Sequence, residues 1–194
     1  MDKGIKPNAL AGHSLGEYTA CTAAGSLRLA DAVRLVRARG QFMQEAVPEG
    51  TGAMAAVIGL SARPIEMICE EISVETQAVV EPVNYNAPGQ LVIAGHVVAV
   101  EASLPKLREA GAKRALMLPV SAPFHCSLMR SAADRLEEIL ADIDVQKPSV
   151  PVIQSVSIEP EIDAERIKTQ LVTQIFSPIY WTKILESLSK LNVT

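Results

Sequence analysis

Cysteine, long apolar runs and basic charge are scarce in this sequence, and each scarcity excludes a class of protein. Cys21, Cys69 and Cys126 lie far apart without C-x-x-C spacing, so neither a disulfide framework nor a zinc site is indicated. No run approaches the ~20 apolar residues of a membrane-spanning helix, and residues 1–7 lack the apolar segment of a signal peptide. The net charge of −4 argues against a nucleic-acid or anionic-membrane surface. We therefore expect a protein of the reducing cytoplasm.

The composition is that of an ordinary globular chain. Its 194 residues are 48% hydrophobic and 21% charged, which suffices to bury a sizeable core. At this length we expect one domain with a sub-domain.

A candidate nucleophile lies near the start of the chain. Residues 12–16 read Gly-His-Ser-Leu-Gly, with a short apolar run, 9–11, before them and a helix-forming run after them. This is the strand, G-x-S-x-G and helix order of a nucleophile elbow, in which a strained serine lies on a sharp turn and flanking glycines allow close approach. The motif predicts Ser14 as the nucleophile and the Leu15 amide, at a helix N-terminus, as an oxyanion donor. A chance match to a short pattern is the alternative.

An arginine on a buried helix face is the second candidate. Residues 27–47 read as a helix, and Arg39 shares the face of Ala32, Val36 and Met43 by helical spacing. An inward arginine is costly unless it meets an anion, and its planar fork suits a carboxylate. The residues alone leave two readings open, a structural ion pair with a core acid and a ligand-binding arginine.

The middle of the chain predicts a separate unit. A turn cluster at 48–52 precedes the order strand, helix, strand, strand, helix, strand, which suggests a ferredoxin-like sub-domain. The expected elements are residues 54–60, 63–72, 78–85, 90–94, 98–110 and 114–118.

The last third supplies a candidate base. We expect a helix over 127–143, a strand over 152–157, a helix over 163–176 capped by Asp163, and a final helix over 182–191. A serine nucleophile needs a base, and the chain has three histidines. His13 adjoins Ser14 and cannot easily reach back to its hydroxyl, so His125 is the predicted base. A Cys126 nucleophile beside His125 is the weaker alternative.

Four stretches resemble one family, the malonyl-CoA:acyl carrier protein transacylases and related acyltransferase domains. Residues 12–18, Gly-His-Ser-Leu-Gly-Glu-Tyr, resemble its nucleophile motif, and residues 39–44 resemble the Arg-Gly segment that holds the malonyl carboxylate. Residues 123–129 resemble its Pro-x-His-x-x-x-Met loop, and 174–181 its Gln-x-x-x-Pro-x-x-Trp segment. The resemblance implies that Arg39 binds malonyl, that His125 is the base, and that the main-chain carbonyl of Gln174 orients His125. An exposed helix-end glutamine is the alternative for Gln174.

The resemblance also implies an activity. A malonyl group would pass from coenzyme A to the phosphopantetheine thiol of acyl carrier protein through an acyl-serine, as in fatty acid biosynthesis, without a metal or bound cofactor. The substrate would be bound by Arg39, Leu15, His13, Met43 and Phe124. Phenylalanine before the histidine points to malonyl rather than methylmalonyl. We expect acyl carrier protein and malonyl-CoA as partners, no nucleic acid or membrane, and a monomer.

The family fold is an α/β hydrolase-like core with a parallel sheet and a ferredoxin-like (βαββαβ) insertion. Here the core would comprise residues 1–50 and 120–194, and the insertion 51–119. The matched region corresponds to the middle of the family, beyond the N-terminal loop whose glutamine completes the oxyanion hole. Two other functions stay open: a serine esterase or thioesterase that uses the same Ser14 and His125, and a non-catalytic fragment that binds carrier protein.

Overall fold

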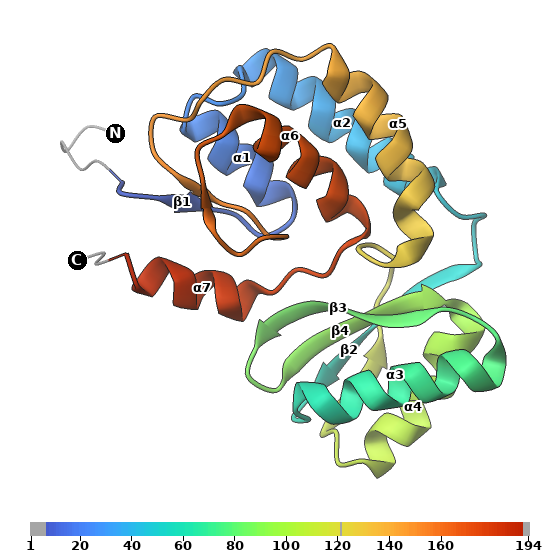
Figure 1. The fold of residues 1–194 in the computed structure, drawn as a ribbon. Helices are drawn as coiled ribbons and strands as arrows, with labels where there is room; N and C mark the ends of the chain where they lie inside the picture. Colours follow the sequence, from blue (N-terminus) through green and yellow to red (C-terminus); the bar gives the residue numbers. More distant parts are fainter. Residues whose placement is uncertain (1–6, 121, 192–194) are drawn as a thin grey trace.

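Two units of mixed helix and sheet make up the chain, one at each end of the view in Figure 1. The computed structural model describes residues 7–120 and 122–191. The expectations for residues 1–6, and for Ser121 in the predicted histidine loop, lie outside the described residues.

Helices surround a small sheet in the first unit (Figure 1). Its strand order is β1-β6-β7, with β1 parallel to β6 and β7 antiparallel to β6, so the described sheet is mixed rather than purely parallel. The elements are β1 (Leu10–Ala11), α1 (Leu15–Ala23), α2 (Leu29–Glu45), the short 3₁₀ helix η1 (Ser127–Met129), α5 (Arg130–Ala141), β6 (Val152–Ile153), β7 (Pro160–Glu161), α6 (Ala164–Thr173), the 3₁₀ helix η2 (Gln174–Phe176) and α7 (Trp181–Ser189).

One predicted strand is shorter than expected. The strand predicted over 152–157 ends at Ile153, because the chain turns back on itself after this point. Ile158 has a φ of 62°, and its amide bonds the carbonyl of Gln154 at 2.9 Å. Asp163 caps α6 as predicted, since its carboxylate accepts from the amide of Arg166.

The core of this unit lies between its helices and the sheet. Large apolar side chains from α1, α2, α5 and α6 meet there, and burying each contributes roughly 1.5–3 kcal/mol relative to exposure. Fully buried members include Tyr18, Leu35, Leu136, Leu140, Ile167 and Leu171.

The second unit is a four-stranded antiparallel sheet with two helices on one face (Figure 1). Its strand order is β3-β4-β2-β5, and its elements follow the order that the sequence predicts. They are β2 (Gly52–Ile58), α3 (Ala62–Thr76), β3 (Val80–Ala87), β4 (Gln90–His96), α4 (Val97–Glu109) and β5 (Arg114–Met117).

The two faces of this sheet serve different neighbours. Successive side chains of a strand point to opposite faces, so Ala55 and Val57 pack with the helices while Met54 packs on the other side. Met54 belongs to a cluster with Cys126, against which Phe124 packs. The face of the sheet opposite α3 and α4 therefore packs against the loop that carries His125.

The segment before α7 also joins the two units. It runs beside β3, where the Ile179 amide bonds the Val83 carbonyl at 2.8 Å and the Tyr85 amide bonds the Ile179 carbonyl at 2.9 Å. The rings of Tyr85 and Tyr180 stack at 4.6 Å. Helix α7 consequently lies between the small sheet of the first unit and the sheet of the second (Figure 1).

A carboxylate of the sheet also accepts hydrogen bonds from the segment that follows His125. Glu81 of β3 accepts from the backbone amide of Ser127 at 2.8 Å and from its hydroxyl at 2.7 Å. Ser127 begins η1, two residues after His125. Glu81 thus caps the helical turn that follows the predicted base.

No helix in the described residues 7–120 and 122–191 combines the length and apolar character that crossing a membrane requires.

Glu81→Ala should destabilise the fold, because it leaves two donors of Ser127 without their charged acceptor. We expect a loss of about 1.5–3 kcal/mol in the free energy of unfolding, measured by urea denaturation. Glu75→Ala is the control, since it removes only an exposed ion pair with Lys106. Equal midpoints for the Glu81 variant and the wild type would contradict the capping role.

Candidate active site

The predicted elbow is present at Ser14. This serine joins β1 to α1 with φ 53° and ψ −109°, a conformation that non-glycine residues rarely adopt. A Cβ on Gly12 would collide with the backbone of Gly16, so the turn requires glycine at position 12. A Cβ on Gly16 would meet open space. The expectation that both glycines permit close approach is therefore right for Gly12 and wrong for Gly16.

Leu15 is the first residue of α1. Its amide is among the first N–H groups of the helix, which have no acceptor within the helix. Its side chain is half exposed and lines a groove between α1 and α2. Any part of Leu15 in substrate binding would thus rest on its backbone.

The hydroxyl of Ser14 meets His125, which comes from a loop far along the chain. Ser14 Oγ lies 2.7 Å from His125 Nε2, and His125 Nδ1 lies 3.0 Å from the carbonyl oxygen of Gln174. A carbonyl can only accept, so Nδ1 carries the proton and Nε2 is free to accept from the serine. His125 itself has a φ of 66°. The main-chain contact expected from Gln174 is thus present, and the exposed alternative is wrong because Gln174 is fully buried.

The surroundings keep His125 neutral. Burial, and then the positive charge of Arg39, lower its pKa to about 3, while the Gln174 carbonyl acts in the opposite sense. A neutral imidazole can take a proton from Ser14. His125 is thus in the base-competent form throughout the physiological pH range.

Arg39 projects from α2 toward the same place. Its Nη2 donates to Ser14 Oγ at 2.9 Å and to the side-chain Oε1 of Gln174 at 3.0 Å, and its guanidinium lies 5.4 Å from the ring centre of Tyr18. Arg39 is 6% exposed, and its Nε has no acceptor among the described residues. Within residues 7–120 and 122–191 it forms no salt bridge. The structural ion-pair reading is therefore wrong for the described part of the chain.

A cavity of about 320 Å³ brings these groups together. Three of the residues that line it, His13, Met43 and Phe124, are among the predicted substrate-binding residues. Their binding roles stay predictions. The His13 ring is held by Asn86, whose Oδ1 lies 2.9 Å from its Nε2. The lining residues are His13, Ser14, Arg39, Gly40, Met43, Met54, Asn84, Phe124 and His125.

Cys126 lies beside His125 but faces elsewhere. Its thiol is buried and donates to the carbonyl of Pro123 at 3.0 Å. Burial raises the pKa of this thiol to about 12. A thiol held so firmly in its protonated form is a poor nucleophile, which contradicts the cysteine alternative.

Sequence reasoning missed a buried acid under the site. Glu17 is fully buried, and burial raises the pKa of its carboxyl to about 7. Its Oε2 accepts from the side-chain amide of Gln174 at 2.7 Å and from the hydroxyl of Ser155. Its helical spacing to the apolar residues Ala20 and Cys21 was the available signal, since it places Glu17 on the buried face of α1.

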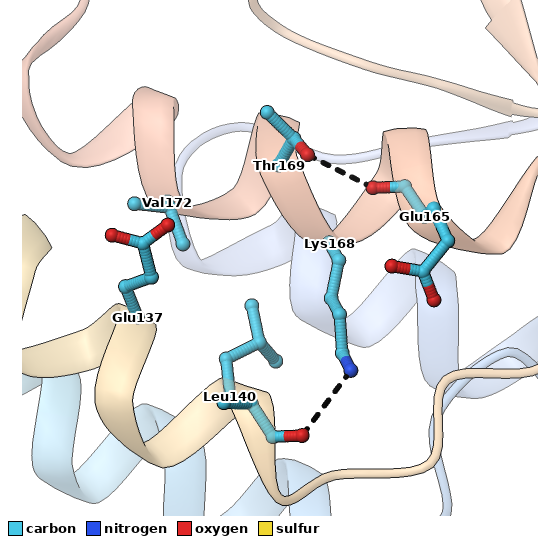
Figure 2. A pocket seen from close by; sticks show the side chains of 7 residues that line it. Glu137, Leu140, Glu165, Lys168, Thr169 and Val172 are labelled. Atoms are coloured by element: carbon cyan, nitrogen blue, oxygen red, sulfur yellow. Dashed lines mark hydrogen bonds between the residues drawn. The ribbon is translucent and has the colours of Figure 1, made fainter.

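A second cavity, of about 310 Å³, lies between α5 and α6 and is shown in Figure 2. Its polar side chains are two surface acids, Thr169 and Lys168, and the Lys168 ammonium lies 3.5 Å from the carbonyl oxygen of Ala141. It is lined by Glu137, Leu140, Ala141, Glu165, Lys168, Thr169 and Val172. It holds no serine or histidine, so the cavity at Ser14 is the candidate site.

A serine and a neutral histidine beside a buried arginine are groups that acyl transfer through a serine can use. The sequence matches the family described as Acyl transferase domain over residues 2–194. The chain belongs to this acyl transferase domain family.

Named relatives agree with this membership. The chain is 54% identical over 190 residues to the malonyl CoA-acyl carrier protein transacylase of Salmonella typhimurium, covering 98% of this chain and 61% of that protein. A solved malonyl CoA-acyl carrier protein transacylase from Coxiella burnetii matches with a TM-score of 0.95 and 44% identity, over 98% of this chain and 60% of that one.

A complex is also among the similar structures. It contains a type II PKS acyl-carrier protein and its malonyl-transacylase, and matches with a TM-score of 0.95 and 46% identity, over 98% of this chain and 61% of that one. The chain spans about 61% of the length of the curated relative from Salmonella typhimurium.

The charge of Arg39, after burial, should contribute to the pH at which Ser14 loses reactivity. In the wild type, we expect the rate of Ser14 labelling by a neutral fluorophosphonate to fall only below about pH 5, because the pKa of His125 is low. Arg39→Ala removes a positive charge, so the pKa of His125 should rise and the acid limb should move to higher pH. Arg37→Ala, on the exposed face of the same helix, is the control. An unmoved acid limb in the Arg39 variant would contradict this coupling.

Proposed function

We propose that this chain transfers a malonyl group from malonyl-CoA to the phosphopantetheine thiol of acyl carrier protein. The observation that carries the proposal is the placement of Arg39 beside the Ser14–His125 pair in one cavity. Arginine binds carboxylates through paired N–H groups, and Arg39 Nε has no acceptor among the described residues. A malonyl carboxylate would provide that acceptor.

In the first half-reaction Ser14 attacks the thioester. His125 Nε2 takes the hydroxyl proton, a bond forms between Oγ and the malonyl carbonyl carbon, and the carbon–sulfur bond breaks. Coenzyme A leaves as the thiol with the proton returned by His125. The Gln174 carbonyl favours the tautomer that this exchange requires, because it accepts from Nδ1–H.

In the second half-reaction the carrier thiol reverses these steps. His125 takes the thiol proton, sulfur attacks the acyl-serine, and Ser14 regains its proton as the ester bond breaks. Arg39 holds the carboxylate through both halves. We propose the Leu15 amide as an oxyanion donor, because it lies at the N-terminus of α1 directly after the nucleophile.

The relatives support the choice of substrate and partner. Curated proteins 54% identical to this chain are named malonyl CoA-acyl carrier protein transacylases, and the similar complex contains an acyl-carrier protein. Simple ester hydrolysis would leave the buried arginine without a substrate group to bind. We propose that Met43 and Phe124 shape the malonyl end of the cavity and that His13, fixed by Asn86, forms its rim.

Finer descriptions of the fold and setting belong to the same proposal. The strand order β3-β4-β2-β5 with α3 and α4 on one face supports a ferredoxin-like insertion over 51–119. The parallel pair β1 and β6 with the elbow at Ser14 supports a hydrolase-like core over 1–50 and 120–194. The nucleophile, the base and the carboxylate partner of the transfer are all side chains of this chain, so we propose no metal or bound cofactor. Free cysteines at all three positions support a cytoplasmic setting.

Malonyl-CoA should acylate Ser14, as intact-mass spectrometry can detect after seconds of exposure. Ser14→Ala should take no malonyl group. Arg39→Ala should slow malonyl acylation roughly 30-fold or more, because it removes a buried charge partner of the substrate. Arg37→Ala, on the exposed face of α2, should match the wild type.

Acetyl-CoA tests the selectivity directly, since it lacks the carboxylate. The wild type should react with it far more slowly than with malonyl-CoA, and Arg39→Ala should narrow that difference. Folded wild-type protein that takes up acetyl and malonyl groups equally, or neither, would contradict the proposed function.

A further inference from the structure

We propose that Glu17 is a positioning residue whose carboxylate fixes the Gln174 carboxamide, which in turn fixes Arg39 in the cavity. This inference rests on the proposed function, because Arg39 is the group assigned to the malonyl carboxylate. It concerns the side chain of Gln174, whereas the main-chain carbonyl of the same residue contacts His125.

The contacts of Glu17 are concentrated on one oxygen. Oε2 lies 2.7 Å from the side-chain nitrogen of Gln174 and 3.2 Å from the backbone amide of Ser155, and it also accepts from the Ser155 hydroxyl. Oε1 has no partner among the described residues. Burying a carboxylic acid completely costs free energy even when the acid is hydrogen-bonded. The packing of this core alone therefore gives no reason for a glutamate at position 17.

The Gln174 carboxamide transmits the effect because its two ends differ. The amide nitrogen only donates, and it bonds both Glu17 and the backbone carbonyl of Ser14, the latter at 3.1 Å. The amide oxygen only accepts, and it is thereby directed to Arg39 Nη2 at 3.0 Å. Without Glu17 the amide loses an acceptor on its nitrogen side. A flipped amide would place its NH₂ against the guanidinium, donor against donor.

Arg39 depends on that orientation. Its Nη2 has two hydrogens, and one bonds the Gln174 oxygen while the other bonds Ser14 Oγ. The guanidinium plane is therefore set beside the nucleophile before any substrate arrives, which lowers the cost of ordering on binding. Losing Glu17 should weaken recognition of the carboxylate more than the chemistry of the Ser14–His125 pair.

Two reactions of the same serine separate these effects. Ser14 acylation by malonyl-CoA depends on the contact of Arg39 with the substrate carboxylate, whereas labelling by a neutral fluorophosphonate at pH 7, well above the pKa of His125, needs the Ser14–His125 pair and no carboxylate contact. Glu17→Ala should slow malonyl acylation roughly ten-fold or more, as expected for a displaced charged hydrogen bond. Its labelling rate should stay within about three-fold of the wild type, a split that general loosening of the fold would not produce.

Two further variants complete the test. Glu17→Gln should keep most malonyl acylation, because the substituted amide oxygen can accept from Gln174 while its NH₂ takes the place of the unpartnered Oε1. Ser155→Ala is the matched control, since it removes another donor from the same carboxylate without touching Gln174. It should leave both reactions close to the wild type.

Defined outcomes overturn the inference. Parallel loss of both reactions in Glu17→Ala, in protein shown to be folded by circular dichroism, would assign Glu17 to the scaffold. An unchanged rate of malonyl acylation in Glu17→Ala would show that Glu17 does not position Arg39. If Glu17→Ala does not fold, a ten-fold loss of malonyl acylation in Glu17→Gln contradicts the acceptor role. A wild type that takes no malonyl group contradicts the proposed function itself, whereas normal wild-type acylation with an unaffected Glu17 variant contradicts this inference alone.

Discussion

The hydrogen bond between Ser14 and His125 joins residues 111 positions apart, and much of the structure serves to bring them to 2.7 Å. Both residues have positive φ, which costs of order 1–3 kcal/mol each and persists only where the surroundings impose it. Glycine at position 12 admits the tight turn at Ser14. At the other end, the Gln174 carbonyl holds the imidazole ring, and the second unit supports its loop from below.

The site concentrates buried polar groups that would destabilise an ordinary core. Arg39 lines the cavity, with Gln174 and Glu17 behind it, and each of the three is less than one-tenth exposed. Burying charges is costly, so the two apolar cores must supply the compensating stability. What these buried polar groups provide is an electrostatic environment at the cavity. In the proposed function, the fixed cation Arg39 attracts the substrate carboxylate and also helps to keep His125 neutral, as a general base must be.

Local chemistry decided which features the sequence could predict. The elbow at Ser14, the buried face of Arg39 and the element order of the second unit follow from short-range patterns, and the structure contains all three. The early end of β6 comes from the turn that bonds the Ile158 amide to the Gln154 carbonyl, which the apolar pattern of residues 152–157 does not predict. The open space beside Gly16 likewise leaves no signal in the sequence. Contacts such as Glu81 with Ser127 are set by tertiary packing and leave no periodic signal. The catalytic roles remain predictions that geometry supports.

The most direct test of the account is a crystal structure of the chain after reaction with malonyl-CoA. The account predicts an ester on Ser14 Oγ whose free carboxylate pairs with the guanidinium of Arg39, with His125 still bonded to the Gln174 carbonyl. An ester whose carboxylate points to solvent, with Arg39 still bonded as in the unliganded chain, would contradict it.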